Sequence, residues 1–244
     1  RLEIVSAIKN SFVVYAIGLA STLLLGIPFA NAIYKRIRGS QVFKVLLFLP
    51  SILSSVVMVI LYKYFIQEAY PVLINKILGL DIIGPLASRN VKEVFGAIVF
   101  FNIFTGFGSS MLIYTGTMSG ISESVTEAAK IDGITPFKEY IYITLPSIYP
   151  TISTFIVVGV AGIFTNQMNL YTFYGGAADN RMSTLGYYLY KSILSANSLS
   201  NPNVEYPYLA AFGIVITLVA VPLTLFVRYL MDKMGPKTEE ESKA

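Results

Sequence analysis

Long stretches without Asp, Glu, Lys or Arg constrain the fold of this chain more than any other feature. A bilayer core about 30 Å thick is crossed by roughly 20 apolar residues of helix. Stretches of comparable or greater length cover 11–34, 45–62, 94–122, 140–178 and 206–227. Their apolar residues run continuously instead of alternating with polar ones, which favours helices over membrane-spanning strands. We therefore predict an all-α, polytopic membrane protein with five visible spans.

Two of these stretches are expected to be longer than the helices they contain. Pro146 and Pro150 place the start of the fourth spanning helix near Ile148, and we expect that helix to end near Tyr174. The third helix is expected to end near Met118. Because the sequence begins with Arg rather than Met, we also expect a first span upstream of Arg1.

The composition excludes several classes of protein. Only 13% of the residues are charged and 55% are hydrophobic, whereas soluble domains carry about 25% charge. The lack of Cys and His excludes thiol nucleophiles, disulfides, the usual zinc sites and imidazole bases. No convincing pair for intramembrane catalysis is present, so no catalytic residue, metal or cofactor is expected. The net charge of +4 is not gathered into one basic stripe with aromatics, which argues against nucleic acid as a partner.

Basic residues in short loops predict the orientation, because Lys and Arg are in excess on the cytoplasmic side. Four of them follow the first span: Lys35, Arg36, Arg38 and Lys44. This loop is therefore placed in the cytoplasm, together with loop 119–147 and a flexible tail at 236–244. Loops 66–93 and 174–205 are placed outside.

The two outer loops contain helical patterns of their own. The apolar stretch 72–80 lies between glycines and prolines and predicts a short interfacial helix. Residues 182–194 also read as helical, with Tyr187, Tyr190 and Leu194 on one side. These tyrosines are interpreted as an aromatic belt at headgroup level, the alternative being a surface for an external partner.

Loop 119–147 has too many start and stop signals to be a simple connector. Ser124 and Glu127 have the spacing of a capping box, with Ser122 as a second candidate cap. Gly133 is placed to end this helix in a left-handed conformation. Thr135 as cap and Pro136 as first residue then start another helix, whose apolar stripe comprises Phe137, Tyr140, Ile141 and Leu145. The sequence predicts two short helices that meet at a glycine bend and move as a unit.

At this loop the residues resemble a known family. Glu127-Ala128-Ala129, Gly133 after three more residues, and then Ile143, Leu145 and Pro146 are similar to the consensus cytoplasmic loop of importer permeases of the ATP-binding cassette (ABC) class. The carbohydrate branch, which includes the maltose importer subunits, is indicated by three further segments. They are Phe48-Leu49-Pro50, Ala128-Ala129-Lys130-Ile131-Asp132-Gly133, and Thr184-Leu185 followed by Tyr187 to Tyr190.

The resemblance implies a type I ABC importer permease fold, with a permease domain over 1–235. Its partners would be a second, homologous permease, two ATPase subunits, an extracytoplasmic solute-binding protein and a sugar. The ATPase-coupling residues would be Glu127, Ala128, Ala129, Asp132, Gly133, Leu145 and Pro146. The chain is not expected to be an enzyme, since no Gly-x-x-x-x-Gly-Lys-Ser/Thr phosphate loop occurs in it. An amphipathic loop resting on the membrane surface without a partner is the alternative.

Polar side chains inside a span tend to face protein or a water-filled path. The candidate substrate-pathway residues are Asn166, Gln167, Asn169, Tyr171 and Asn102. Amides and phenols suit sugar hydroxyls, which both donate and accept hydrogen bonds, and Asn166 and Asn169 are expected to share one helical face. Hydrogen bonding between helices is the alternative role.

The function expected is a permease subunit in the cell membrane that forms half of a sugar pathway. The alternatives are an ABC permease for a non-sugar solute and a non-transporting membrane scaffold. The spans lack acidic residues except at their edges, which counts against proton- or sodium-coupled carriers.

Overall fold

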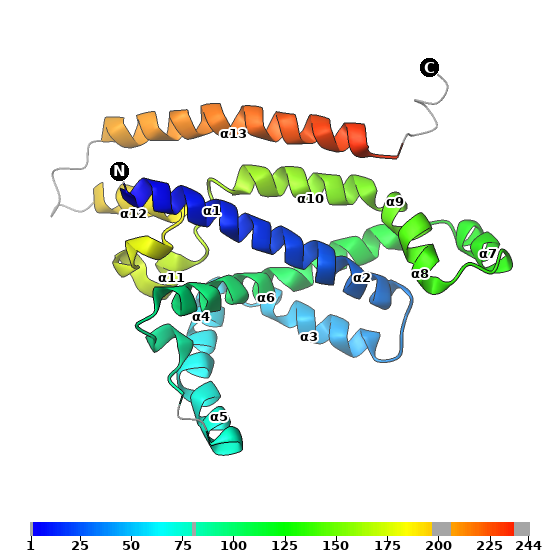
Figure 1. Ribbon diagram of the computed structural model, residues 1–244, viewed down its shortest axis with the longest axis horizontal. Coiled ribbons are helices and arrows are strands. Elements are labelled where there is room, and N and C mark those ends of the chain that lie inside the picture. Colours follow the sequence, from blue (N-terminus) through cyan, green and yellow to red (C-terminus); the bar gives the residue numbers. More distant parts are fainter. Residues whose placement is uncertain (1, 80–81, 197–205, 237–244) are drawn as a thin grey trace.

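The computed structural model describes residues 2–79, 82–196 and 206–236, and over these ranges the chain is helical with no β-strand. The helices lie mostly alongside one another in an elongated bundle (Figure 1). The prediction of an all-α chain is confirmed for these residues. The α-helices are α1 (Leu2–Ser21), α2 (Ile27–Tyr34), α3 (Ser40–Ile52), α4 (Ser55–Tyr64), α5 (Tyr70–Leu78), α6 (Val91–Met118), α7 (Glu123–Ile131), α8 (Pro136–Glu139), α9 (Leu145–Ser147), α10 (Tyr149–Gly162), α11 (Leu170–Tyr174), α12 (Leu185–Ala196) and α13 (Tyr206–Met234).

Short π-helical and 3₁₀ segments connect some of these helices. The π-helical turns join α1 to α2, α4 to α5 and α8 to α9, so each of these pairs is one continuous helix. They are Thr22–Gly26, Phe65–Ala69 and Tyr140–Thr144. The 3₁₀ turns are Pro85–Ala87, Gly175–Ala177 and Asn180–Met182.

Four helices of the described chain are long and apolar enough to cross a membrane, and a bent pair makes a fifth candidate. The four are Glu3–Tyr34, Ser55–Leu78, Val91–Met118 and Tyr206–Met234, and the pair is Pro136–Ser147 with Tyr149–Gly162. The predicted first, third and fifth spans are thus confirmed. The first begins earlier and the fifth ends later than the charge-free stretches, and the third ends at Met118 as expected.

The second predicted span, 45–62, is wrong as a single helix. It breaks where Leu53 and Ser54 adopt extended backbone, with ψ of 150° and 145°. Pro50 lies inside α3 and removes a backbone hydrogen bond, and the Ser54 side chain then caps α4 by accepting from the Val57 N–H at 3.4 Å. The helix that starts at this cap continues to Leu78 and includes most of the interfacial helix predicted at 72–80. Helix α5 leads away from the bundle (Figure 1).

The fourth predicted helix, Ile148 to Tyr174, is also wrong at its second end. It stops at Gly162, and residues 163–169 are irregular before α11. Met168 and Asn169 both have positive φ, 53° and 54°, and the Asn166 side chain accepts from the Met168 N–H at 2.8 Å. Hydrogen bonds from Asn side chains to the nearby backbone compete with helix formation. Residues 163–169 therefore stay outside the helix that was expected to continue to Tyr174.

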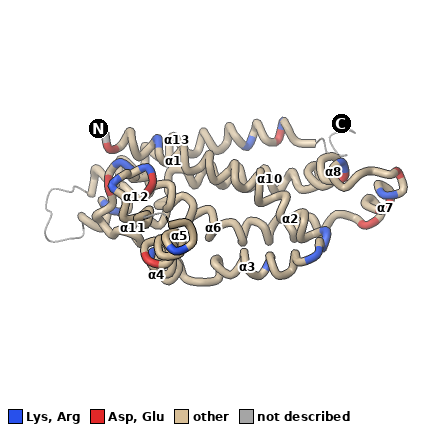
Figure 2. Tube along the Cα trace, turned by 60° about the horizontal axis from the view of Figure 1, so that its bottom comes forward, with Lys and Arg blue, Asp and Glu red and all other residues tan. Residues whose placement is uncertain are grey.

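Three groups of buried apolar residues hold the bundle together. One joins α6 to α4 and α11, a second joins α2, α6 and the start of α10, and a third joins α1 to α10, α12 and α13. The loop after α2, helices α7 and α8, and the last turn of α13 share one end of the bundle, and α11, α12 and the start of α1 share the other (Figure 1). Charged residues gather mainly toward these two ends, and long middle parts of the helices have none (Figure 2).

Candidate functional site

Helix α7 projects from the end of the bundle where the loop after α2 lies, and most of its surface is exposed (Figure 1). Ala129 is the exception, with 4% of its surface accessible. Glu127, Ala128 and Asp132 are exposed, and Ile131 is 86% exposed. Helix α7 therefore packs against the rest of the chain through Ala129, while acidic and apolar residues face outward.

The predicted glycine bend is present and has a Schellman geometry. Gly133 has φ of +72°, its N–H donates to Lys130 O at 3.1 Å, and the Ile134 N–H donates to Ala129 O at 3.1 Å. Helix α7 starts at the second predicted cap: Ser122 is the N-cap residue, but its side chain forms no capping bond, and its hydroxyl lies 2.7 Å from that of Ser124. The capping box does not form because Ser124 already lies inside the helix.

Helix α8 begins as predicted, with Thr135 as cap and Pro136 in the first turn. Of its apolar stripe, Tyr140 and Leu145 pack against the buried group that contains Ile33 and Ile148, whereas Phe137 is 71% exposed. Pro146 is half-buried in the last turn of this helix, just before a 62° bend into α10. The second helix of the loop is thus attached to the bundle along only part of its stripe.

An ion pair between a half-buried lysine and a buried glutamate fixes this helix to the rest of the chain. Glu139, 6% exposed, receives a hydrogen bond from the ammonium group of Lys35 just beyond α2. The sequence indicated Lys35 only as an orientation signal and gave Glu139 no role. Opposite charges on two loops of the same side were the single signal that could have suggested the contact.

Asn102, in the middle of α6, joins that helix to the irregular segment after α10. Its Nδ2 donates to Met168 O at 2.9 Å and to Ile98 O at 2.8 Å, and its Oδ1 accepts from Asn169 Nδ2 at 2.9 Å. Both amides therefore keep some unused hydrogen-bonding capacity. The structure brings these two predicted residues together, but through a turn and not through one helical face.

Two cavities meet at Asn102. One, of about 370 Å³, lies between α6 and the break between α3 and α4, and its polar lining is Ser51, Ser55, Asn102, Thr105, Ser109 and Asn169. The other, of about 440 Å³, lies among α1, α6 and α10 and is mostly apolar, with Asn166 at its wall. A chain of hydroxyls and amides thus follows α6 beside the break in the second predicted span.

Two of the predicted pathway residues, Gln167 and Tyr171, line neither cavity. The Tyr171 ring packs edge-on against Tyr190, with the ring centroids 5.0 Å apart. Asn166 is fixed by its backbone, since Thr184 Oγ1 donates to its carbonyl at 2.7 Å. The sequence therefore identified the polar region but could not separate cavity walls from packing.

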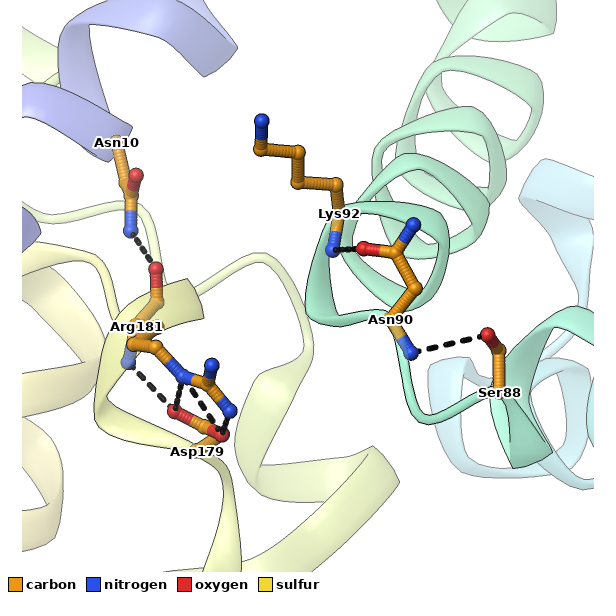
Figure 3. Close-up of polar contacts among 6 residues, drawn as sticks. All are labelled: Asn10, Ser88, Asn90, Lys92, Asp179 and Arg181. Atoms are coloured by element: carbon orange, nitrogen blue, oxygen red, sulfur yellow. Dashed lines mark hydrogen bonds and ion pairs between the residues drawn. The ribbon is translucent and has the colours of Figure 1, made fainter.

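At the opposite end of the bundle, hydrogen bonds fix the turn before α12 to α1 (Figure 3). Asn10 on α1 donates to Arg181 O at 2.9 Å, and the Arg181 guanidinium contacts both carboxylate oxygens of Asp179. The side-chain and backbone hydrogen bonds from Arg181 hold the pKa of Asp179 below its usual value, and the same pair raises the pKa of Arg181. Asn90 caps α6 nearby in the same view.

Apolar helices of bilayer length, a charge-poor middle and an exposed helical loop define a multi-pass membrane protein. A family model described as "Binding-protein-dependent transport system inner membrane component" matches residues 22–239, and the chain belongs to this family.

Curated relatives cover most of the chain. The inner membrane ABC transporter permease protein YcjO of Escherichia coli (strain K12) is 24% identical over 227 residues, 91% of this chain and 73% of that protein. The multiple sugar-binding transport system permease protein MsmF of Streptococcus mutans is 21% identical over 81% of this chain and 65% of its own length. The diacetylchitobiose uptake system permease protein NgcF of Streptomyces coelicolor is 25% identical over 93% and 63%.

Solved structures confirm the permease fold. A bacterial ABC transporter involved in the import of the acidic polysaccharide alginate matches with a TM-score of 0.77, 20% identity, and coverage of 97% of this chain and 81% of that one. The same kind of transporter in complex with an alginate-bound periplasmic protein matches with a TM-score of 0.75 and 21% identity, over 96% and 80%.

Proposed function

We propose that this chain is the membrane-spanning subunit of an ABC importer and forms half of the pathway for a sugar or oligosaccharide. The relatives support the substrate class, because their names specify multiple sugars, diacetylchitobiose, galactooligosaccharides, arabinooligosaccharides and lactose. The observation that carries the proposal is the family match together with the polar cavity at Asn102. Amide and hydroxyl groups of this kind can both donate to and accept from sugar hydroxyls.

The partners proposed are a second permease of the same family, two ATPase subunits and an external solute-binding protein. Helix α7 is proposed to seat in a cleft of one ATPase, with Glu127, Ala128, Asp132 and Gly133 on the docking element. Its exposed apolar residue Ile131 supports this role, because exposed apolar surface beside charged residues is typical of protein interfaces. Leu145 and Pro146 would then pass the displacement into α10.

The pathway is proposed to follow the polar wall of α6. Asn102 and Asn169 would contact substrate in the smaller cavity, and Asn166 would line the larger one. For Gln167 and Tyr171 we propose packing roles near the pathway, because neither contributes to a cavity wall.

The experiment is uptake and ATP hydrolysis by vesicles that hold the complete complex and a panel of neutral and acidic sugars. Wild type is expected to accumulate a sugar with binding-protein-stimulated hydrolysis. Gly133→Val and Glu127→Lys are expected to insert normally but to lose the stimulation, whereas Glu68→Lys, the same charge change on an exposed residue between α4 and α5, keeps it. ATP turnover without accumulation would favour a scaffold, and uptake only of a non-sugar solute would overturn the substrate class.

A further inference from the structure

The ion pair between Lys35 and Glu139 joins two elements that are 104 residues apart in the chain. The other two ion pairs of the described residues are local, since Arg181 pairs with Asp179 and Arg228 with Asp232. Glu139 is also the single charged residue among those that the described structure buries. This contact therefore differs from the exposed pairs, which contribute little to stability.

The local structure favours both charges at these positions. Lys35 follows the last turn of α2, where carbonyl groups point out of the helix, and Glu139 lies in the first turn of α8, where N–H groups do. Each charge is thus at the helix end whose dipole stabilises it. The ammonium group also lies 5.3 Å from the centroid of the Tyr34 ring, which restricts its position.

The pair lies between the docking helix and the helix that walls the larger cavity. Helices α1 and α2 form one continuous rod over Glu3–Tyr34, and Val14, Tyr15 and Gly18 of this rod line the 440 Å³ cavity. On the other side, α8 follows α7 directly through the Gly133 bend. The covalent route from α7 to the pathway runs through α9 and the 62° bend into α10.

We propose that Lys35 and Glu139 are positioning residues for energy coupling, forming a second mechanical connection from the docking helix to the pathway. Through it, a displacement of α7 and α8 moves the α1–α2 rod as well as α10. The α1 and α10 walls of the larger cavity are then driven together, because a packed helix moves as a unit. The proposal rests on the proposed function, since it assigns the pair a role in the transport cycle.

The deciding variant is the double neutral change Lys35→Met with Glu139→Gln. Lys35→Met alone would leave the buried Glu139 carboxylate without its partner, which destabilises the fold by itself, whereas the double change removes both charges. In vesicles with the complete complex, the double variant is expected to assemble and hydrolyse ATP but to use several-fold more ATP per sugar imported. The swap Lys35→Glu with Glu139→Lys is expected to recover part of the wild-type ratio.

The control is Lys138→Gln, which removes an exposed charge next to Glu139 and should leave the ratio unchanged. A normal ratio in the assembled double variant would overturn the proposal. If the double variant does not assemble, the swap variant provides the test. The proposal would be overturned if the swap variant used as much ATP per sugar imported as the assembled single variant Glu139→Gln. If wild type itself shows no stimulated hydrolysis or uptake, the proposed function fails instead.

Discussion

Asn169 donates a hydrogen bond from Nδ2 to the Oδ1 of Asn102 at 2.9 Å, which ties the turn after α10 to the middle of α6. Because Asn102 also donates to the carbonyl of Met168, one side chain holds both a polar cavity wall and a backbone segment with positive φ. The amide that we propose to meet the substrate is therefore also the amide that shapes the turn.

Asn102→Ala is expected to lower both uptake and stability. The change leaves the carbonyl of the buried Met168 without the Asn102 N–H, and an unsatisfied buried group costs about 1–3 kcal/mol. It also removes the acceptor of Asn169 Nδ2 at the cavity wall. Asn169→Ala, or Asn166→Ala with Asn169→Ala, should also reduce uptake, with a further loss of stability because Asn169 has positive φ and Asn166 accepts from the Met168 N–H. Transport kinetics and thermal unfolding in detergent separate the two effects.

The matched control for these changes is Gln167→Ala, which removes a neighbouring amide that lines neither cavity. Its uptake should equal that of wild type. Equal loss in Gln167→Ala and Asn169→Ala would mean that the turn is sensitive to any change and that Asn169 does not contact the substrate.

The sequence located the first, third and fifth membrane helices of the described chain, but it missed the break in the second predicted span and the early end of the fourth. A stretch without charged residues indicates that a segment can lie in the bilayer, but it does not show whether the segment is one helix. A break such as Leu53-Ser54 introduces no charge, so the charge-free stretch continues through it. In the irregular segment after α10, the Asn166 side chain accepts a local hydrogen bond from the Met168 N–H. Such bonds depend on backbone angles that residue type alone does not fix.

Loop 119–147 was easier to predict than the candidate pathway. Gly133, Thr135 and Pro136 act through local backbone geometry, which their residue types specify directly. The contacts Lys35 to Glu139 and Asn102 to Asn169 link segments distant in sequence. These contacts form only when α2, α6 and α8 pack as they do in the fold. The sequence pattern therefore could not show which of these residues pair with each other.

Gly108→Ala is expected to weaken the packing of α3 on α6. A Cβ at this position would lie 2.2 Å from Leu47 O and 2.8 Å from Phe48 Cα. These are backbone atoms that cannot rotate away, so α3 must shift, at a cost of about 1–3 kcal/mol. Thermal unfolding of the purified protein in detergent should show a lower midpoint.

Gly116→Ala on the same helix is the control, because a Cβ there meets nothing within 4 Å. Removing a glycine from a helix interior stabilises it by up to about 1 kcal/mol. The two changes should therefore shift the unfolding midpoint in opposite directions, and a shift of the same sign in both would contradict the close contact at Gly108.

The turn before α12 should respond to acid through Asp179. Its pKa is lowered in the folded protein by hydrogen bonds from Arg181, so its ionisation stabilises the fold above the unfolded pKa of about 3.9. This contribution is lost as the pH falls through the lower, folded pKa. Wild type should exceed Asp179→Asn in unfolding midpoint near neutral pH, and the difference should vanish below the folded pKa. A difference that grows on acidification would contradict this sign.

The last prediction concerns the bend that connects α7 to α8. Gly133 has φ of +72° and open space where a Cβ would lie, so a substitution meets backbone strain and no clash. A β-branched residue in this conformation costs on the order of 1–3 kcal/mol, whereas Asn tolerates it well. Stimulated ATP hydrolysis should therefore be retained in Gly133→Asn, reduced in Gly133→Ala and lost in Gly133→Val. Equal loss in all three variants would show that docking requires the absence of any side chain at position 133. The proposal that docking depends on the geometry of the bend would then be wrong.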